Sequence, residues 1–272
     1  MRRTTLAALC LTAVTVAGVA GCLPGEDKAD GSPSGQNSGQ ASGKPAAKVS
    51  KGPFDGLTGG EIAERALAAT SGASSLRMTG DVPDDESGGT IRIDMALDKR
   101  GECAGTMGMN GQGKADLVKT GGTLYMRYDE KFLRAQSEGS SKEETDGVVA
   151  MLAGKWTKMA ATGADAKDIA GFCDLDTVLA DFEDSGSGAG TGAGVTRGGS
   201  TTVGGKSAVA VTEKDGKDSY TMYVADAGKP YILRIVSTST KDPGTIAFSD
   251  YDQPVAAQKP AGEVLDLDAM GG

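Results

Sequence analysis

Apolar and polar residues alternate with a period of two through much of the chain between residues 76 and 249. Ile91, Ile93, Met95 and Leu97, for example, are separated by charged or small residues. Such alternation is typical of strands that bury one face. Gly-rich and Asp-Gly turns separate several of the alternating runs, which predicts antiparallel hairpins. The predicted strands are Leu76–Thr79, Ile91–Asp98, Gly101–Met109, Lys114–Lys119, Thr123–Tyr128, Lys155–Met159, Ala208–Thr212, Ser219–Val224, Tyr231–Ser237 and Thr245–Ser249.

Apolar residues at helical spacing occur before the first strand and at two places between the strands. Thr58 and Glu61 form a capping-box pattern, which predicts a helix over Glu61–Thr70 that Ser71-Gly72 ends. A second helix is expected over Glu143–Leu152, with an apolar stripe of Val148, Val149, Met151 and Leu152. A third is expected over Leu175–Phe182, where Asp174 or Asp176 would be the N-cap.

Together these elements predict an α+β fold, a long antiparallel sheet with helices gathered on one face. Residues 57–272, about 215 residues, suit a single domain. Asp184–Gly194 consists of Gly, Ser, Ala, Thr and Asp, so it is expected to be a flexible loop between two halves of the sheet.

The first 21 residues are expected to form a secretory signal peptide. Arg2 and Arg3 precede the apolar or small stretch Leu6–Ala20, which is too short to span a bilayer comfortably. Val19-Ala20-Gly21-Cys22 resembles the lipobox of bacterial lipoproteins. That resemblance implies cleavage before Cys22 and a diacylglyceryl group on its thiol. The alternative is an ordinary signal peptide with a chance cysteine.

Residues 22–56 are almost all small or polar. Such a segment buries too little apolar surface to offset its conformational entropy, so we expect a disordered tether. Two acyl chains on Cys22 would hold the protein stably at a membrane. The expected location is therefore the extracytoplasmic face of the cell membrane, with the domain raised on the tether.

Cysteine usage agrees with export. Cys10 is lost with the signal peptide and Cys22 carries lipid, which leaves Cys103 and Cys173 as an even pair in an oxidising compartment. We expect a disulfide between them. Two free buried thiols are the alternative.

Charge and composition exclude several functions. The net charge is −9, and losing Arg2 and Arg3 makes it −11, which argues against a nucleic-acid partner. The chain has no histidine, which removes His-based triads and the commonest zinc chemistry. Asp266 and Asp268 are predicted to lie in a solvated tail, because the rest of a calcium-binding loop is missing around them. We therefore expect no cofactor, no metal ion and no enzymatic activity.

Methionine is the unusual apolar component, because aromatic residues make up only 4% of the chain. It fills irregular space and suits surfaces that accept variable apolar shapes, although ordinary core packing explains any single one. Trp156 is expected to be a core anchor. The candidate ligand-binding residues are Met95, Met107, Met109, Met126 and Met222.

The order of lipobox, tether, helix and meandering strands resembles the actinobacterial envelope lipoproteins of the LppX/LprG type, which are similar to the LolA/LolB carriers. The matching segments are Glu61–Thr70 with Ser75–Gly80, Gly122–Met126 with Lys155–Met159, and Tyr223–Asp226 with Gly228–Arg234. The resemblance implies a half-closed, curved sheet (a half-barrel) with helices on its concave face. In several relatives a cavity there holds acylated lipid.

Two functions remain open. The first is a membrane-anchored protein that binds or carries a lipid or glycolipid between sheet and helices. The alternative is a cell-surface interaction or structural lipoprotein with a filled core and no small-molecule ligand, whose protein partner the sequence does not reveal. A cavity lined by methionine favours the first function, and a solid core favours the second.

Overall fold

The computed structural model describes residues 52–84, 89–109, 111–163, 166–184, 194–239 and 243–271. They belong to one compact unit, Val49–Gly272. The strands are β1 Ser75–Asp84, β2 Gly89–Asp98, β3 Cys103–Met109, β4 Gly113–Thr120, β5 Thr123–Tyr128, β6 Trp156–Ala160, β7 Thr196–Val203, β8 Lys206–Asp215, β9 Asp218–Ala225, β10 Ile232–Ser237, β11 Gly244–Ser249 and β12 Val264–Asp266.

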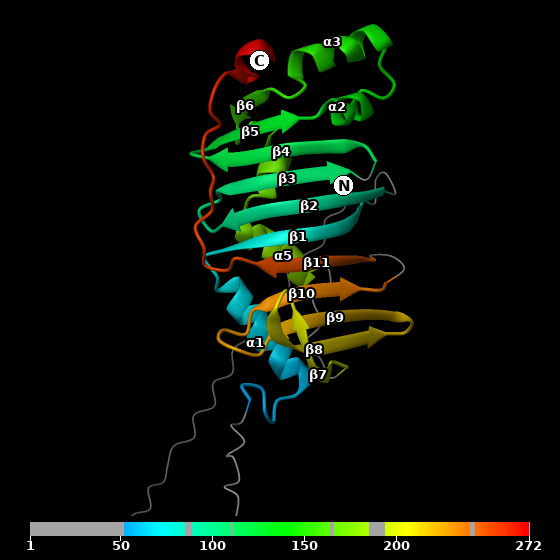
Figure 1. Cartoon of the computed structure of the whole chain (residues 1–272), viewed down its shortest axis with the longest axis vertical. Coiled ribbons are helices and arrows are strands. Elements are labelled where there is room, and N and C mark those ends of the chain that lie inside the picture. Colours follow the sequence, from blue (N-terminus) through cyan, green and yellow to red (C-terminus); the bar gives the residue numbers. More distant parts are fainter. Residues whose placement is uncertain are drawn as a thin grey trace, which may run out of the picture. The chain divides into compact units, whose positions relative to one another are not determined.

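These strands form one open sheet in the order β12-β6-β5-β4-β3-β2-β1-β11-β10-β9-β8-β7, and Figure 1 shows them stacked side by side. β12 is parallel to β6, and the other neighbouring strands are antiparallel. β1 pairs with β11, which joins the two halves of the chain at the middle of the sheet. Each run predicted from alternation forms a strand, and β1 and β8 extend beyond the predicted ends.

The helices are α1 Gly59–Ser71, α2 Glu130–Gln136, α3 Lys142–Leu152, α4 Lys167–Gly171, α5 Leu175–Asp184 and α6 Asp268–Gly271. The capping box at Thr58 and Glu61 is confirmed, and Gly72 is the C-cap of α1. At α5, Asp174 rather than Asp176 is the cap, because its Oδ1 accepts a hydrogen bond from the backbone N of Thr177 at 2.9 Å.

One face of the sheet, called the inner face below, packs with α1, α4 and α5 into a single apolar cluster. This cluster includes Leu117 and Met95 of the sheet and Ile62 and Leu175 of the helices. The side chains of these four residues are at most 2% exposed. In Figure 1, α5 lies across the strands near β1 and β11. The expected fold, a long antiparallel sheet with helices on one face, is confirmed.

Some elements differ from the sequence expectations. The packed domain begins before Leu57, because Phe54 is 3% exposed and its carbonyl accepts a hydrogen bond from Arg197 Nη1 at 2.7 Å. Strand β7 was not predicted, because all its residues except Val203 are exposed and its pattern carries no apolar alternation. Most of the segment 184–194 and residues 1–51, including Cys22, lie outside the described residues.

The prediction that Asp266 and Asp268 form a solvated tail is wrong. Asp266 lies in β12 and pairs with Lys158 at 2.7 Å, while Asp268 Oδ2 accepts a hydrogen bond from the backbone N of Ala160 at 2.8 Å. The hydrogen bond from Lys158 lowers the pKa of the Asp266 carboxyl. These carboxylates attach the C-terminal segment to the edge of the sheet.

The expectation that Trp156 anchors the core is also wrong. In β6 the buried position belongs to Thr157, which is 0% exposed and donates a hydrogen bond from Oγ1 to the Met126 carbonyl at 3.0 Å. Because neighbouring residues of a strand point to opposite faces, Trp156 lies on the outer face. There the Arg127 guanidinium lies 4.9 Å from the centre of its ring.

Candidate functional site

All five candidate methionines lie on the inner face. Met107 is opposite Ile93 and Ala115, and residues opposite each other in a sheet share a face. The same registers connect the others: Met95 is opposite Met78, Met109 opposite Ile91, Met126 opposite Leu117, and Met222 opposite Val211. The period-two pattern therefore placed these side chains on the correct face.

Burial divides the five into two groups. Met95, Met126 and Met222 are 2%, 6% and 0% exposed and lie within the main apolar cluster. Met107 is only partly buried and packs against that cluster. Met109 is also partly buried, and its sulfur lies 3.7 Å from Nε2 of Gln136 in α2. Only Met107 and Met109 therefore lie where the apolar inner face approaches solvent.

The cover over the inner face is uneven. α1 contacts β7, β8, β9 and β10, whereas α2 contacts β4 and contributes one buried side chain, Leu133. α3 has no buried residue and is joined to α2 by an ion pair between Arg134 and Asp146 at 2.9 Å. After Cys103, every residue of β3 is half-buried. Of the described parts of the inner face, the end of β3 is thus the least covered.

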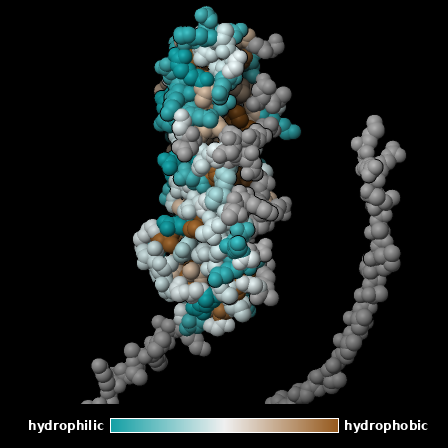
Figure 2. Space-filling view, turned by 90° about the vertical axis from the view of Figure 1, so that its right-hand side faces the viewer, coloured by the Kyte–Doolittle hydropathy of each residue, from teal (hydrophilic) through white to brown (hydrophobic). Residues whose placement is uncertain are grey.

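A cavity of about 830 Å³ lies beside the end of β3, along the edge where β1, β3 and β10 end and β2, β4 and β11 begin, and most of the strand side chains that line it face outward. This is the right-hand edge of the sheet in Figure 1. Figure 2 faces that edge and shows hydrophobic areas among mostly hydrophilic side chains. The volume lies within the usual range of ligand pockets. Its lining includes Met107, Met109, Gly108, Gly113, Asp81, Arg92, Lys114, Asp129 and Lys131.

The two acidic residues that line the cavity, Asp81 and Asp129, both accept hydrogen bonds from other groups of the protein. Asp81 and Arg92 are cross-strand partners joined by two hydrogen bonds of 2.9 and 3.3 Å, and the bond from Arg92 lowers the pKa of the Asp81 carboxyl. Asp129 caps α2, since its side chain accepts hydrogen bonds from the backbone N of Phe132 at 2.7 Å and of Lys114 at 3.0 Å. Both carboxylates are therefore engaged within the protein.

Arg92, Lys114 and Lys131 were not singled out from the sequence. Arg92 and Lys114 occupy polar positions that the alternating pattern assigns to solvent, and Lys131 lies in α2, a helix that the sequence pattern did not predict. No sequence signal identified them, because the sheet register brings Arg92 and Lys114 to one edge and the packing of α2 brings Lys131 to the same cavity.

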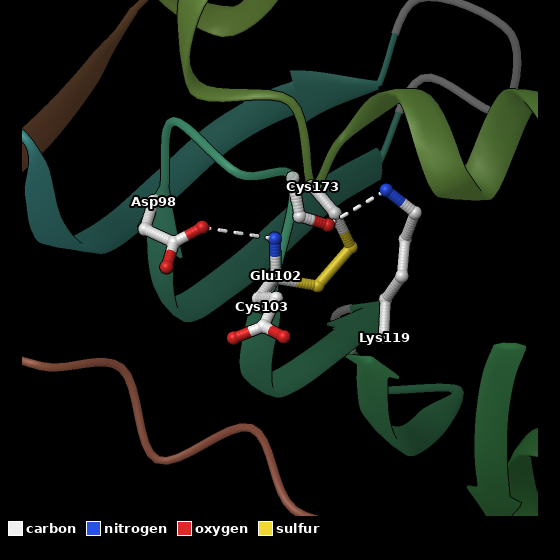
Figure 3. The surroundings of a disulfide bond; sticks show 6 residues. Asp98, Glu102, Cys103, Lys119 and Cys173 are labelled. Atoms are coloured by element: carbon white, nitrogen blue, oxygen red, sulfur yellow. Dashed lines mark hydrogen bonds between the residues drawn. A yellow bond between two sulfur atoms is a disulfide. The ribbon is translucent and has the colours of Figure 1, made fainter. Parts of the chain in front are cut away.

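The predicted disulfide joins Cys103 and Cys173, with 5.2 Å between their Cα atoms. Figure 3 shows the bond connecting the start of β3 to the chain just before α5. Nearby, Asp98 accepts a hydrogen bond from the backbone N of Glu102 at 3.0 Å, and Lys119 Nζ donates one to the Gly101 carbonyl at 2.7 Å. Because both cysteines are 0% exposed, the disulfide is a buried attachment of α5 to the sheet.

None of the helices in the described ranges has the length and hydrophobicity that a membrane span requires. Within the same ranges, no three His, Cys, Asp or Glu side chains gather closely enough to hold a metal ion.

No known family model matches the sequence, and no curated protein matches it. The structure is similar to the crystal structure of LprF from Mycobacterium bovis, with 15% identity over 75% of this chain and 97% of that chain and a TM-score of 0.49. It is also similar to the Mycobacterium tuberculosis lipoprotein LppX, with 12% identity over 74% and 98% of the two chains and a TM-score of 0.44.

A LolA superfamily protein from Nitrosomonas europaea is a more distant match, with 8% identity over 75% of this chain and 96% of that chain and a TM-score of 0.23. At these identities the similarity concerns the fold alone.

Proposed function

We propose that this chain is a lipid-anchored envelope protein that binds or carries an apolar ligand, such as a lipid or glycolipid, at the uncovered end of its inner face. Diacylated Cys22 would anchor it to the extracytoplasmic side of the cell membrane, and the following polar segment would separate the domain from the bilayer. In this proposal the ligand reaches the inner face through the cavity at the strand ends.

The observation that carries the proposal is the partial exposure of Met107 and Met109 beside a cavity of about 830 Å³. Both side chains continue the apolar inner face, so an acyl chain in the cavity would meet flexible, polarisable groups. Burying one sixteen-carbon chain contributes on the order of 10 kcal/mol before ordering and association costs. That is sufficient for useful affinity.

The packed methionines favour the alternative, a cell-surface interaction protein without a small-molecule ligand. Met95, Met126 and Met222 fill the core and leave no reason to expect a ligand deep between sheet and helices. The two functions therefore differ in whether an apolar ligand binds in the cavity beside the end of β3.

The test is mass spectrometry of organic extracts from the full-length lipoprotein and two variants, Met107→Asp and Met109→Asp. A carboxylate there would repel an acyl chain, so we expect both variants to lose the co-purified lipid while they are still exported. Met151→Asp is the matched control, because Met151 is 46% exposed on α3 and does not line the cavity.

Thermal unfolding of each variant separates loss of ligand from loss of fold. If the wild type yields only the lipid attached to Cys22, or if all three variants retain the same lipid as the wild type, the carrier function is refuted. The interaction function would then take its place.

A further inference from the structure

The strand-end cavity is bordered by both faces of the sheet, and the two borders differ in chemistry. Met107 and Met109 belong to the inner face, whereas Gly108 lies between them in β3 and faces outward. The register places Arg92 and Lys114 on either side of Gly108, on the outer face. An apolar border therefore adjoins a cationic one along the edge of a single strand.

Because Gly108 has no side chain, no side chain of β3 stands between the two cations. Neighbouring strands lie about 4.8 Å apart, so the backbones of Arg92 and Lys114 are separated by about 10 Å. The space directly beside Gly108 is tight, since a Cβ there would lie 3.0 Å from the Gly113 carbonyl oxygen and 3.3 Å from the Cβ of Lys114.

Among the described residues that line the cavity, the balance of charge is positive. Asp81 is paired with Arg92, and Asp129 accepts hydrogen bonds from two backbone N–H groups. Lys114 and Lys131 line the same cavity, and neither ammonium group has a hydrogen-bond or ion-pair partner in the described part of the chain. In a chain of net charge −9, two unpaired cations beside a cavity form a locally favourable place for an anion.

We propose that the ligand is an amphiphile with an anionic head group, a phosphate or carboxylate, and that Lys114 and Lys131 bind this group. The inference rests on the proposed lipid-binding function and specifies its ligand class. The acyl chain contacts Met107 and Met109 on the inner side of the edge, and the head group stays at the strand ends, where Lys114 of the outer face and Lys131 of α2 line the same cavity. Charge-assisted hydrogen bonds from the two ammonium groups supply the selectivity.

Native mass spectrometry of the full-length lipoprotein in detergent tests this inference. The probes are dipalmitoylphosphatidylglycerol, which has a phosphate, dipalmitoylglycerol, which has the same acyl chains without it, and inorganic phosphate. The test variant is Lys114→Gln/Lys131→Gln. The matched control is Lys206→Gln/Lys217→Gln, which removes the same charge from two exposed lysines outside the cavity.

We expect the wild type to bind the phosphatidylglycerol at least tenfold more tightly than the diacylglycerol. The Lys114/Lys131 variant should lose that difference and keep its affinity for diacylglycerol, while the control variant behaves as the wild type. Added salt should weaken binding of the anionic lipid alone, because salt screens exposed charges.

Three results would overturn the inference. Equal binding of the two lipids, unchanged in the Lys114/Lys131 variant, refutes the head-group site and leaves the lipid-binding function standing. Binding of inorganic phosphate that depends on these lysines, with no preference between the lipids, identifies a free-anion site instead. Failure of both lipids to bind refutes the proposed function itself.

Discussion

Removing the disulfide tests how this fold keeps its helical cover in place. Cys103 and Cys173 are separated by 70 residues, and the bond restricts that loop in the unfolded chain. In the chain-entropy model a loop of this size corresponds to about 15 cal/mol/K, or about 4 kcal/mol at 25 °C. Proteins of this size have about 5–15 kcal/mol of stability, so the loss would be a large fraction of it.

The perturbation is the double variant Cys103→Ala/Cys173→Ala, measured by urea unfolding with linear extrapolation. We expect the free energy of unfolding to fall by about 4 kcal/mol, with about 1 kcal/mol more from the lost packing of two fully buried sulfur atoms. For a domain of this size the melting temperature should fall by about 10–20 °C.

The single variant Cys173→Ala is the control, because it removes the same loop restriction and only one of the sulfur atoms. Its loss should therefore be nearly as large as that of the double variant. Peptide mapping without reductant must first show the two cysteines linked in the wild type. If they are linked and the double variant lies within about 1 kcal/mol of the wild type, the argument from the unfolded state is wrong.

Three further predictions follow from single positions. Cys22→Ala should abolish acylation and lipoprotein-type cleavage, since the thiol is the attachment atom; membrane-fraction blots would show an unprocessed product, and a processed, membrane-bound one would contradict the lipobox. Gly113→Ala should destabilise the fold by about 2–3 kcal/mol, because Gly113 has φ +91° and a Cβ would overlap Asp129 Oδ1 and the backbone N of Phe132. Gly111→Ala, with φ +76° and open space, should cost only about 1 kcal/mol in the same unfolding assay, and equal losses would refute the steric argument. The pKa of Asp252 is lowered by hydrogen bonds from Tyr231, Ser74 and Lys229, so its stabilising contribution should be complete above about pH 4 and fade as the pH falls further; Asp252→Asn should be less stable than wild type at pH 6, and a gap that stays constant down to pH 2 would contradict this.

The local pattern of the chain determined most of its secondary structure. Alternation predicted the strands, including β2 with Ile93 and Met95 on its inner face, because one buried face imposes a period of two. The capping box at Thr58 located the start of α1, since its hydrogen bonds join residues only three apart. The two cysteines that remain after the signal-peptide and lipobox assignments predicted the disulfide without any knowledge of the fold.

Tertiary structure decided what depends on partners distant in the sequence. β7 is a polar edge strand, and β12 forms only by pairing with β6, more than a hundred residues away. Trp156 faces outward because the register gives the inner position to Thr157.

The candidate site also depends on contacts between residues that are distant in the sequence. In the sequence, Met95 and Met107 both occupy apolar positions of alternating runs. In the structure, Met95 is buried and Met107 lies beside the cavity. The difference arises from where α2 and α5 cover the sheet, and the cationic edge exists because three strands bring Arg92, Gly108 and Lys114 into one row. Alternation specifies which face a side chain occupies, but only the packing of other elements determines whether that face is covered.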